Sequence, residues 1–408
     1  MALKPPVQVP QGAIRLNTDS QKLEFYAQDQ WWEMATHIGD NTGGTRGCIG
    51  FKFDNSANSG VIDYVTIEST GDAVDFGDLT YTFYGGSCGS ATRGFWFGGT
   101  ASPSTDTIEY VEFATQGDAI DFGNLTGAIR YSPAGVSDKT RGIRTGGTTS
   151  PSSAIDIIDY WTMSITGNAL DFGDMDVATR FACSCNSATR GVIAGGDTSP
   201  GQTNRIEFIT MQTLGNGIDF GADLTLARYS AAVASNGTRG LFAGGYAPGN
   251  KNIIDYITIQ STGVAAQDFG DLTSGRRYIT SSFSSSTRAI FAGALTPGAT
   301  ADVNFVTMST LGDAAHFGDL INPNFGAHGS SISSNSVRGI RMGGTYDGAT
   351  VNTIEYLTIA TLGDGQDFGE LSTTAFGQAS AAASTIALRA VVLRAVGAAQ
   401  TRGARRRG

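Results

Sequence analysis

Two short motifs recur along this 408-residue chain with one shared period, and this repetition limits the possible folds more than any other feature. Thr-Arg-Gly or a close variant recurs every 47 to 50 residues, beginning at Thr45, Thr92, Thr140, Thr189, Thr238, Thr287 and Val337. Asp-Phe-Gly keeps step with it, beginning at Asp75, Asp121, Asp171, Asp219, Asp268 and Asp367, with His316 in the sixth unit. Seven units of this length are typical of a β-propeller, because one unit cannot cover both faces of its own sheet.

Each unit contains the patterns of four short strands. The apolar run after each arginine ends in paired glycines, as at 240–245, so we place it near the crowded ring axis. The run at 254–259 is rich in β-branched and aromatic residues and predicts a mid-blade strand. A tight glycine turn leads into the Asp-Phe-Gly strand, and a strand such as 227–233 completes the unit. The expected fold is all-β, a seven-bladed β-propeller of four-stranded blades.

The end of the repeat region predicts how the ring closes. Residues 374–383 occupy the place of the strand before the arginine, so we expect them to complete the blade that begins at Thr45. The propeller would then span residues 41–383. The Ala/Arg-rich tail at 384–408 departs from the pattern; it could dock to a partner, be disordered, or come from a shifted reading frame or a cloning scar.

Residues 1–40 form a separate module. Apolar and polar residues alternate around two turns between 11 and 34, which predicts a small three-stranded β-meander. About 40 residues rarely fold alone, so its aromatic residues Phe25, Tyr26, Trp31 and Trp32 must bury against something. The module either caps the first blade or attaches the protein to a larger assembly, and it could also make a homo-oligomer.

The residues used for catalysis or metal binding are scarce. Four cysteines without a C-x-x-C pair and three distant histidines, His37, His316 and His328, argue against a zinc site or a histidine-based triad. Asp-Phe-Gly lacks the other kinase motifs, and no phosphate-binding P-loop or EF-hand loop is present. We therefore expect no catalytic residue, no metal and no cofactor, and a protein that is not an enzyme.

The charge distribution argues against nucleic acid as a partner. Residues 371–408 hold six arginines and no acid, so residues 1–370 carry 21 basic and 37 acidic side chains, a net charge of −16. An acidic body repels phosphate backbones. No segment approaches the roughly 20 apolar residues of a membrane span, and no signal segment precedes the repeats, so we expect cytoplasmic synthesis without membrane insertion.

Repeated charges predict structural links within the blades. The motif arginines are Arg46, Arg93, Arg141, Arg190, Arg239, Arg288 and Arg338. Each recurs with an acid of the mid-blade strand, namely Asp63, Glu109, Asp159, Glu207, Asp255 or Glu355, and with the Asp of Asp-Phe-Gly. We expect the guanidinium groups to bind these acids. The sixth unit has Asn304 and His316 in place of both acids and should lack this network.

One face of the ring should carry the variable loops. These loops lie between the paired glycines and the mid-blade strand, at 54–60, 100–107, 148–154, 197–204, 246–252, 295–302 and 345–352. Varied loops on a rigid scaffold are a common layout for recognition, although drift in unconstrained loops is the alternative. The candidate recognition residues are Asn55, Asn58, Asp106, Asn204, Tyr246, Lys251, Tyr346 and Asp347.

The repeat T-R-G-x-x-x-G-G, I-[DE]-Y-x-T-I and T-G-[DN]-x-x-D-F-G-[DN]-L-T resembles that of kelch-like propeller proteins of marine tailed bacteriophages, including cyanophages. The resemblance covers residues 45–383, and the front module is similar to a segment that begins many phage fibre and virion proteins. It implies a virion structural protein, such as a tail fibre, appendage or decoration protein, that contacts other virion proteins through the front module. Its propeller would face outward towards a host-surface glycan or protein.

Two other functions remain open. The protein could be an assembly component that uses the propeller only to contact other virion proteins. More remotely, it could be a carbohydrate-active enzyme, which would need paired carboxylates converging in a central funnel. No unique acidic pair stands out from the repeats.

Overall fold

The computed structural model of the chain consists of β-strands, turns and loops in the residues that it describes. These residues are 13–17, 22–27, 30–35, 46–50, 52–54, 57–80, 85–99, 104–129, 133–150, 153–198, 201–221, 223–279, 281–296, 298–324, 331–346, 349–375, 379–382 and 392–395. The chain divides into two compact units, Met1–Asp40 with Ala387–Gly408, and Asn41–Ile386. Within the described ranges, no helix is long and apolar enough to cross a lipid bilayer.

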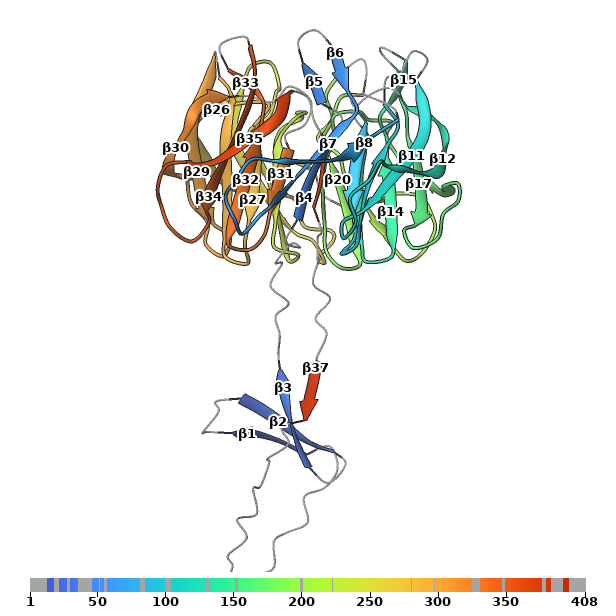
Figure 1. Cartoon of the computed structure of the whole chain (residues 1–408). Helices are drawn as coiled ribbons and strands as arrows, with labels where there is room; N and C mark the ends of the chain where they lie inside the picture. Colours follow the sequence, from blue (N-terminus) through green and yellow to red (C-terminus); the bar gives the residue numbers. More distant parts are fainter. Residues whose placement is uncertain are drawn as a thin grey trace, which may run out of the picture. The chain divides into compact units, whose positions relative to one another are not determined.

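The larger unit is a ring of seven antiparallel sheets, which confirms the predicted seven-bladed propeller (Figure 1). Each blade contains four main strands, and in six of the blades the chain passes through them in order from the ring axis outwards. Innermost strands contact the innermost strands of both neighbouring blades. They are β9 (Gly86–Gly89), β13 (Ala134–Ser137), β19 (Cys183–Asn186), β23 (Ala232–Ser235), β27 (Ser281–Ser284), β31 (Ser331–Ser334) and β36 (Ala379–Ala382).

The second strand of each blade begins with the motif arginine. These strands are β4 (Arg46–Gly50), β10 (Arg93–Phe97), β14 (Arg141–Thr145), β20 (Arg190–Ala194), β24 (Arg239–Ala243), β28 (Arg288–Leu295) and β32 (Arg338–Met342). The third, mid-blade strands are β7 (Val61–Thr66), β11 (Thr105–Glu112), β17 (Ile157–Thr162), β21 (Ile206–Thr210), β25 (Lys251–Thr258), β29 (Ala299–Thr307) and β34 (Ala349–Thr358).

The outermost strands carry Asp-Phe-Gly or its variant. They are β8 (Val74–Asp78), β12 (Ile120–Ile129), β18 (Leu170–Asp174), β22 (Ile218–Asp219), β26 (Gln267–Arg276), β30 (Ala315–Asn324) and β35 (Gln366–Ala375). Short additional strands extend three of the variable loops: β5 (Lys52–Asp54) with β6 (Ala57–Ser59), β15 (Thr148–Ser150) with β16 (Ser153–Ala154), and β33 (Thr345–Tyr346) with β34.

The strand nearest the ring axis is not the arginine strand that we placed there but the one before it. Innermost strands are built from small residues, as in Gly-Ser-Cys-Gly of β9 and Ala-Ser-Ala-Ala of β36. Small side chains suit a place where seven strands converge. The arginine strands lie second from the axis, with all residues after the arginine buried in β10 and β24. The predicted strand at 227–233 also begins later, at Ala232.

The ring closes as the sequence predicts. Strand β36 pairs with β4, from Ala379 opposite Gly50 to Ala382 opposite Gly47, and so supplies the innermost strand of the first blade. Because the two strands are antiparallel, the start of β4 and the end of β36 lie side by side. The first and last strands of the propeller therefore belong to one blade.

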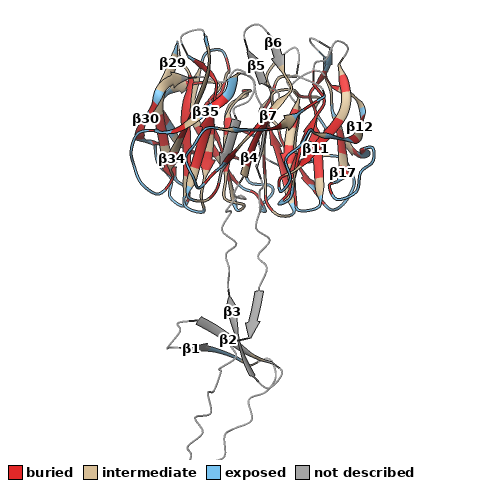
Figure 2. Cartoon of the chain, viewed as in Figure 1, coloured by how far each residue is buried: buried red, intermediate tan, exposed pale blue. Residues whose placement is uncertain are grey.

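Buried residues run along the strands of the blades (Figure 2), and apolar side chains fill the spaces between blades. Every hydrophobic cluster of the described residues combines side chains of two neighbouring blades. At the closure, Ile49 and Val65 of the first blade pack with Ile340 and Met342 of the seventh, and none of the four is more than 2% exposed. Each blade thus buries its apolar faces only against both neighbours, which is the reason that a single unit could not fold alone.

Backbone hydrogen bonds also join each blade to the next at the outer rim. The amide of the glycine in each turn between third and outermost strands donates to the phenylalanine carbonyl of the preceding blade's Asp-Phe-Gly, at 2.7–3.0 Å. The pairs are Gly71–Phe368, Gly117–Phe76, Gly167–Phe122, Gly215–Phe172, Gly263–Phe220, Gly312–Phe269 and Gly363–Phe317. These seven bonds form a closed belt and cover the edge of every outermost strand.

The belt explains why the Asp-Phe-Gly motif ends in glycine. A Cβ on Gly123, in Asp-Phe-Gly of β12, would lie 2.4 Å from the carbonyl oxygen of Gly167 in the adjacent turn. Gly123 also has a φ of 143°, which side chains rarely adopt. The two backbones approach so closely that neither a side chain nor an ordinary φ is possible there.

The smaller unit contains the predicted meander of β1 (Ile14–Asn17), β2 (Lys22–Ala27) and β3 (Gln30–Ala35). The tail supplies a fourth strand that we did not foresee, β37 (Val392–Ala395), which pairs antiparallel with β3. Cross-strand register places Phe25 opposite Trp32 and Tyr26 opposite Trp31. Only Tyr26 has a described side chain among these four, and it is half-buried.

A glycine substitution tests the belt. Gly123→Ala should lower the free energy of unfolding by at least about 2 kcal/mol, because strained φ alone costs roughly 1–3 kcal/mol and the new methyl group collides with the next blade. The matched control is Gly127→Ala in the same strand, where a Cβ meets nothing within 4 Å. Chemical denaturation of the purified variants measures both effects. Equal stability of the two variants would show that the close approach does not matter.

Candidate functional site

The motif arginines connect neighbouring blades, but through different partners from those predicted. Each guanidinium lies over an aromatic ring of its own blade at 4.1–5.0 Å. Each also donates to a backbone carbonyl of the next blade, as Arg239 Nη1 does to Met308 at 2.6 Å. The pairs are Arg46–Phe113, Arg93–Met163, Arg141–Met211, Arg190–Ile259, Arg239–Met308, Arg288–Ile359 and Arg338–Ile67.

The predicted pairing of motif arginine with mid-blade acid was wrong because of strand register. Arg46 lies opposite Thr66, whereas Asp63 lies opposite Ile49, three residues further along the strand. At roughly 3.3 Å per residue, this separates Arg46 from Asp63 by about 10 Å along the strand direction. The Asp of Asp-Phe-Gly instead accepts a hydrogen bond from the glycine amide of its own motif, as Asp121 does from Gly123 at 3.0 Å.

The mid-blade acids join each blade to the preceding one. Asp63, Glu109, Asp159, Glu207, Asp255 and Glu355 are at most 4% exposed. Each accepts hydrogen bonds from backbone amides that follow Asp-Phe-Gly in the preceding blade. Asp255, for example, accepts from both the amide and the hydroxyl of Thr225, at 3.2 and 2.7 Å. The arginines and the acids therefore form two separate sets of links between blades.

Four arginines outside the motif were missed in the sequence. Among the described side chains, Arg144, Arg228, Arg276 and Arg341 are at most 1% exposed, and they pair with Asp159, Asp255, Asp302 and Glu355. Burial lowers the pKa of Arg144, and the charge of Asp159 opposes that effect. Arg144 and Arg341 stand three residues after a motif arginine, directly opposite their acids in the register. That spacing was the signal that could have revealed them.

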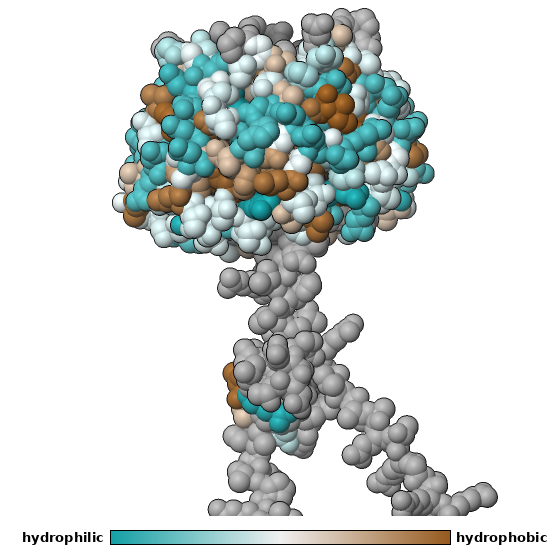
Figure 3. Space-filling view, turned by 90° about the vertical axis from the view of Figure 1, so that its left-hand side faces the viewer, coloured by the Kyte–Doolittle hydropathy of each residue, from teal (hydrophilic) through white to brown (hydrophobic). Residues whose placement is uncertain are grey.

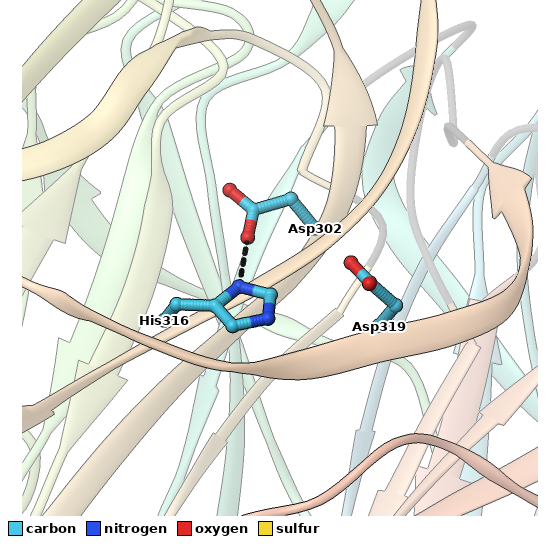
Figure 4. Close-up of side chains that lie close together, drawn as sticks. All are labelled: Asp302, His316 and Asp319. Atoms are coloured by element: carbon cyan, nitrogen blue, oxygen red, sulfur yellow. Dashed lines mark hydrogen bonds and ion pairs between the residues drawn. The ribbon is translucent and has the colours of Figure 1, made fainter.

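The sixth blade keeps an acid that the motif alignment did not reveal. Asn304 takes the place of the buried acid and accepts a hydrogen bond from the Thr273 amide at 3.0 Å. Two residues earlier, Asp302 pairs with Arg276 at 2.6 Å. Asp302 also contacts His316 Nδ1 at 2.7 Å (Figure 4). Although burial would raise the pKa of Asp302, hydrogen bonds from Thr273, Arg276 and His316 lower it to about 2. Both acids are absent from their usual positions, as the sequence shows, but the expected loss of the network is wrong, because Asp302 supplies a carboxylate that pairs with Arg276.

Asp302, His316 and Asp319 bring three possible metal-ligand atoms within 4.8 Å of one another (Figure 4). Asp302 is already held by Arg276, whose positive charge opposes a cation. The fourth blade has a similar pair, Arg205 with Asp219 at 3.0 Å. There the arginine takes the place of Asp302, and the acid takes the place of His316. The sixth-blade cluster thus has a structural explanation as a hydrogen bond between the two outer strands.

The variable loops connect second and third strands, so they leave the ring at one end, as the short strands β5, β6, β15 and β33 show (Figure 1). The predicted recognition residues are placed as follows: Asp106, Asn204, Tyr246 and Lys251 are half-buried, Tyr346 is 40% exposed, Asn58 lies in β6, and Asn55 and Asp347 fall outside the described residues. Lys251 Nζ donates to the carbonyl of Pro248 at 3.2 Å. Of this set, Tyr246 belongs to the cluster of side chains described next.

Phe181, Tyr229, Tyr246, Arg277 and Tyr278 form what we name the aromatic–arginine cluster. All but Tyr246 lie in the links that connect the outermost strand of one blade to the innermost strand of the next. The ring centroids of Phe181 and Tyr229 are 5.9 Å apart, and those of Tyr229 and Tyr246 are 5.4 Å apart. The Arg277 guanidinium lies 4.6 Å from the Tyr246 ring centroid and 5.2 Å from that of Tyr278. All five side chains are half-buried.

Backbone pairing places the cluster on the variable-loop face. Tyr229 bridges to Tyr246, and Arg277 bridges to Leu295, so the links pair with the first residues of the variable loops. The Ser230 amide also donates to the Phe181 carbonyl at 3.3 Å, which joins one link to the next. Burial raises the pKa of Tyr229, and the neighbouring Tyr278 and Tyr246 raise it further. The cluster therefore presents phenol rings and a guanidinium together.

The links of the cluster are strained. Phe181, Ser230 and Tyr278 have φ values of 54°, 53° and 49°, and they are the only residues other than glycine with positive φ in the described part of the chain. Such conformations are costly for side-chain-bearing residues and gather at functional sites. Three consecutive links adopt this strain to hold the aromatic side chains in place.

A different surface, on the turns between third and outermost strands, exposes apolar residues. Ile165, Leu214, Leu311 and Leu362 are 57–68% exposed. Figure 3 shows apolar patches among polar areas on the outer wall of the ring. By strand alternation, these turns lie at the end of the ring opposite to the variable loops.

Two arginine substitutions separate the two kinds of link. Arg228→Ala leaves the Asp255 carboxylate buried without its cation and should cost about 3–5 kcal/mol of unfolding free energy. Arg239→Ala removes a half-buried hydrogen bond and a cation–π contact and should cost only about 1–2 kcal/mol. Denaturant titration of both variants gives the comparison. A larger loss for Arg239→Ala would contradict this assignment.

The comparisons with known proteins support the fold. No protein-family profile matches the sequence, and no curated protein matches it either. Among solved structures, the structure of YjhT is similar, with a TM-score of 0.53 and 12% sequence identity, over 69% of this chain and 96% of YjhT. At this identity the similarity shows the fold alone. The chain is thus a seven-bladed β-propeller whose fold is similar to that of YjhT.

Proposed function

We propose that this protein is a non-enzymatic recognition protein whose propeller binds a glycan at the aromatic–arginine cluster. The observation that carries the proposal is the gathering of three aromatic rings and one guanidinium on three strained links, together with the Tyr246 ring of a variable loop. Strain of this kind persists only where the surrounding structure imposes it. A rigid scaffold that presents such a cluster beside variable loops has the layout of a binding protein.

The chemistry of the cluster suits a sugar. A pyranose ring has an apolar C–H face and a rim of hydroxyl groups, and tyrosine offers an aromatic face with a polar hydroxyl. Tyrosine also loses little conformational entropy on binding, since it has only two side-chain torsions. Tyr229, Tyr246 and Tyr278 are partly accessible and already held by their neighbours. Binding would therefore require little rearrangement.

The repeat and front-module motifs suggest where the protein acts. Their resemblance to phage proteins supports a virion structural protein, located on the particle as a tail fibre, appendage or decoration, whose receptor is a glycan of the host surface. Other virion proteins would then hold the N-terminal module. Neither nucleic acid nor insertion into a membrane is part of this proposal.

A second candidate function is virion assembly, in which the propeller contacts only other virion proteins. The exposed apolar residues Ile165, Leu214, Leu311 and Leu362 favour it, because such residues often mark protein interfaces. They lie at the end opposite to the variable loops, so assembly contacts and glycan binding need not compete. Imaging of particles distinguishes the two, since a receptor-binding protein leaves the variable-loop face in solvent and an assembly protein buries it.

Glycan-array binding with the full chain tests the proposal. Tyr246→Ala should weaken binding of the best glycans at least tenfold, which is about 1.4 kcal/mol, because it removes a ring from the centre of the cluster. Tyr346→Ala is the matched control: it removes a tyrosine from the variable-loop face of the seventh blade and should leave binding unchanged. Thermal melting checks that both variants fold. Failure of the wild-type protein to bind any glycan, or equal loss in both variants, would overturn the proposal.

A further inference from the structure

Arg277 differs from every other arginine of the propeller that the structure describes. The motif arginines donate to backbone carbonyls, the four buried arginines pair with acids, Arg180 pairs with Asp197 at 2.8 Å, and Arg205 pairs with Asp176 and Asp219. Within the described residues, the Arg277 side chain makes no ion pair and donates no hydrogen bond, and its Nε is buried without a partner. Its guanidinium is held only by the two tyrosine rings.

A half-buried guanidinium without a counter-ion is poorly satisfied. Removing a charge from water is costly unless hydrogen bonds and an opposite charge compensate for it. The guanidinium lies over the rings of Tyr246 and Tyr278, and these contacts leave its N–H groups to donate. A carboxylate or sulfate would fit this edge, because two oxygens match the donor fork of arginine.

The charged residues around the cluster do not neutralise Arg277. Asp197 raises the pKa of Tyr229 and is itself held by Arg180 through Nε at 3.0 Å and Nη2 at 2.8 Å. The charge of Asp197 is therefore already compensated, and Arg277 adds one positive charge to the patch. This contrasts with residues 1–370, whose net charge of −16 repels anions in general. An anion attracted to this protein would have to be bound locally.

We infer that Arg277 is an anion subsite and that the ligand is an acidic glycan, with a carboxylate or sulfate group bound by the guanidinium beside the tyrosine rings. The inference rests on the proposed glycan-binding function and adds the chemical class of the ligand. It also assigns specificity to one residue, since the tyrosines alone would accept neutral sugars equally well.

Three monosaccharides that share the same pyranose ring test the inference. They are D-glucose, D-glucuronate and D-glucose 6-sulfate, which differ only at C6. Binding to the full chain is followed by NMR titration. We expect the protein to bind one or both anionic sugars more tightly than glucose, and the preferred sugar shows whether the group is a carboxylate or a sulfate. Arg277→Gln should weaken anionic binding about ten- to a hundredfold, the value of a charge-assisted hydrogen bond, without affecting glucose. Arg277→Lys, which keeps the charge but loses the planar fork, should retain part of the affinity for the anionic sugars.

The control variant is Lys139→Gln, which removes the same charge from an exposed side chain on a turn between first and second strands. It should leave binding of all three sugars unchanged. Equal affinity for glucose and the anionic sugars, no loss in Arg277→Gln, or an equal loss in Lys139→Gln would overturn the inference. If Tyr246→Ala still abolishes neutral-glycan binding in that case, the proposed function stands while the anion subsite falls. If no glycan or sugar binds at all, both fall.

Discussion

The hydrogen bond from each turn glycine to the Asp-Phe-Gly carbonyl of the preceding blade is the contact on which the rest of the propeller depends. It occurs at all seven interfaces, including Gly71 to Phe368 where the last blade meets the first. Beside it, the mid-blade acids bind amides of the preceding blade, and the motif arginines bind carbonyls of the next one. Every blade is therefore fixed on both sides by polar contacts of defined geometry, while apolar clusters fill the space between. The period of about 49 residues exists because each unit must repeat all of these contacts.

This regularity makes the departures from it informative. The sixth blade replaces a buried acid by Asn304 and supplies Asp302 nearby, which preserves a link to Arg276 and so keeps the scaffold intact. The links into the fourth, fifth and sixth blades depart differently, because they accept backbone strain at Phe181, Ser230 and Tyr278 without any benefit to the belt. A costly local conformation that does not help to hold the ring together is best explained by the surface that it creates. That surface is the aromatic–arginine cluster, and Arg277 is its one described cation without a polar partner.

The sequence was sufficient to predict the blades, their number and the closing strand, because repetition records the contacts that every blade shares. It was not sufficient to predict the partners of individual charges. Arg46 and Asp63 occur together in the unit, yet the strand register sets them about 10 Å apart, and a repeat pattern contains no register. The innermost strand was misplaced because paired glycines suggested crowding more strongly than the small residues of β9 or β36. The cluster could not be predicted, because it joins residues about 49 apart in the sequence through positive φ angles. Of its five residues, only Tyr246 was predicted from the sequence as a recognition residue.

Hydrogen exchange of the seven turn-glycine amides tests the central claim most directly. If the belt holds the ring as one unit, these amides, although they lie in surface turns, are protected as strongly as those of the buried second strands. They then exchange together, only in global unfolding. Fast exchange of the turn glycines, or early exchange at Gly71 while the other six stay protected, would contradict the account. The first result would show that the belt is dispensable, and the second that the ring opens where its ends meet.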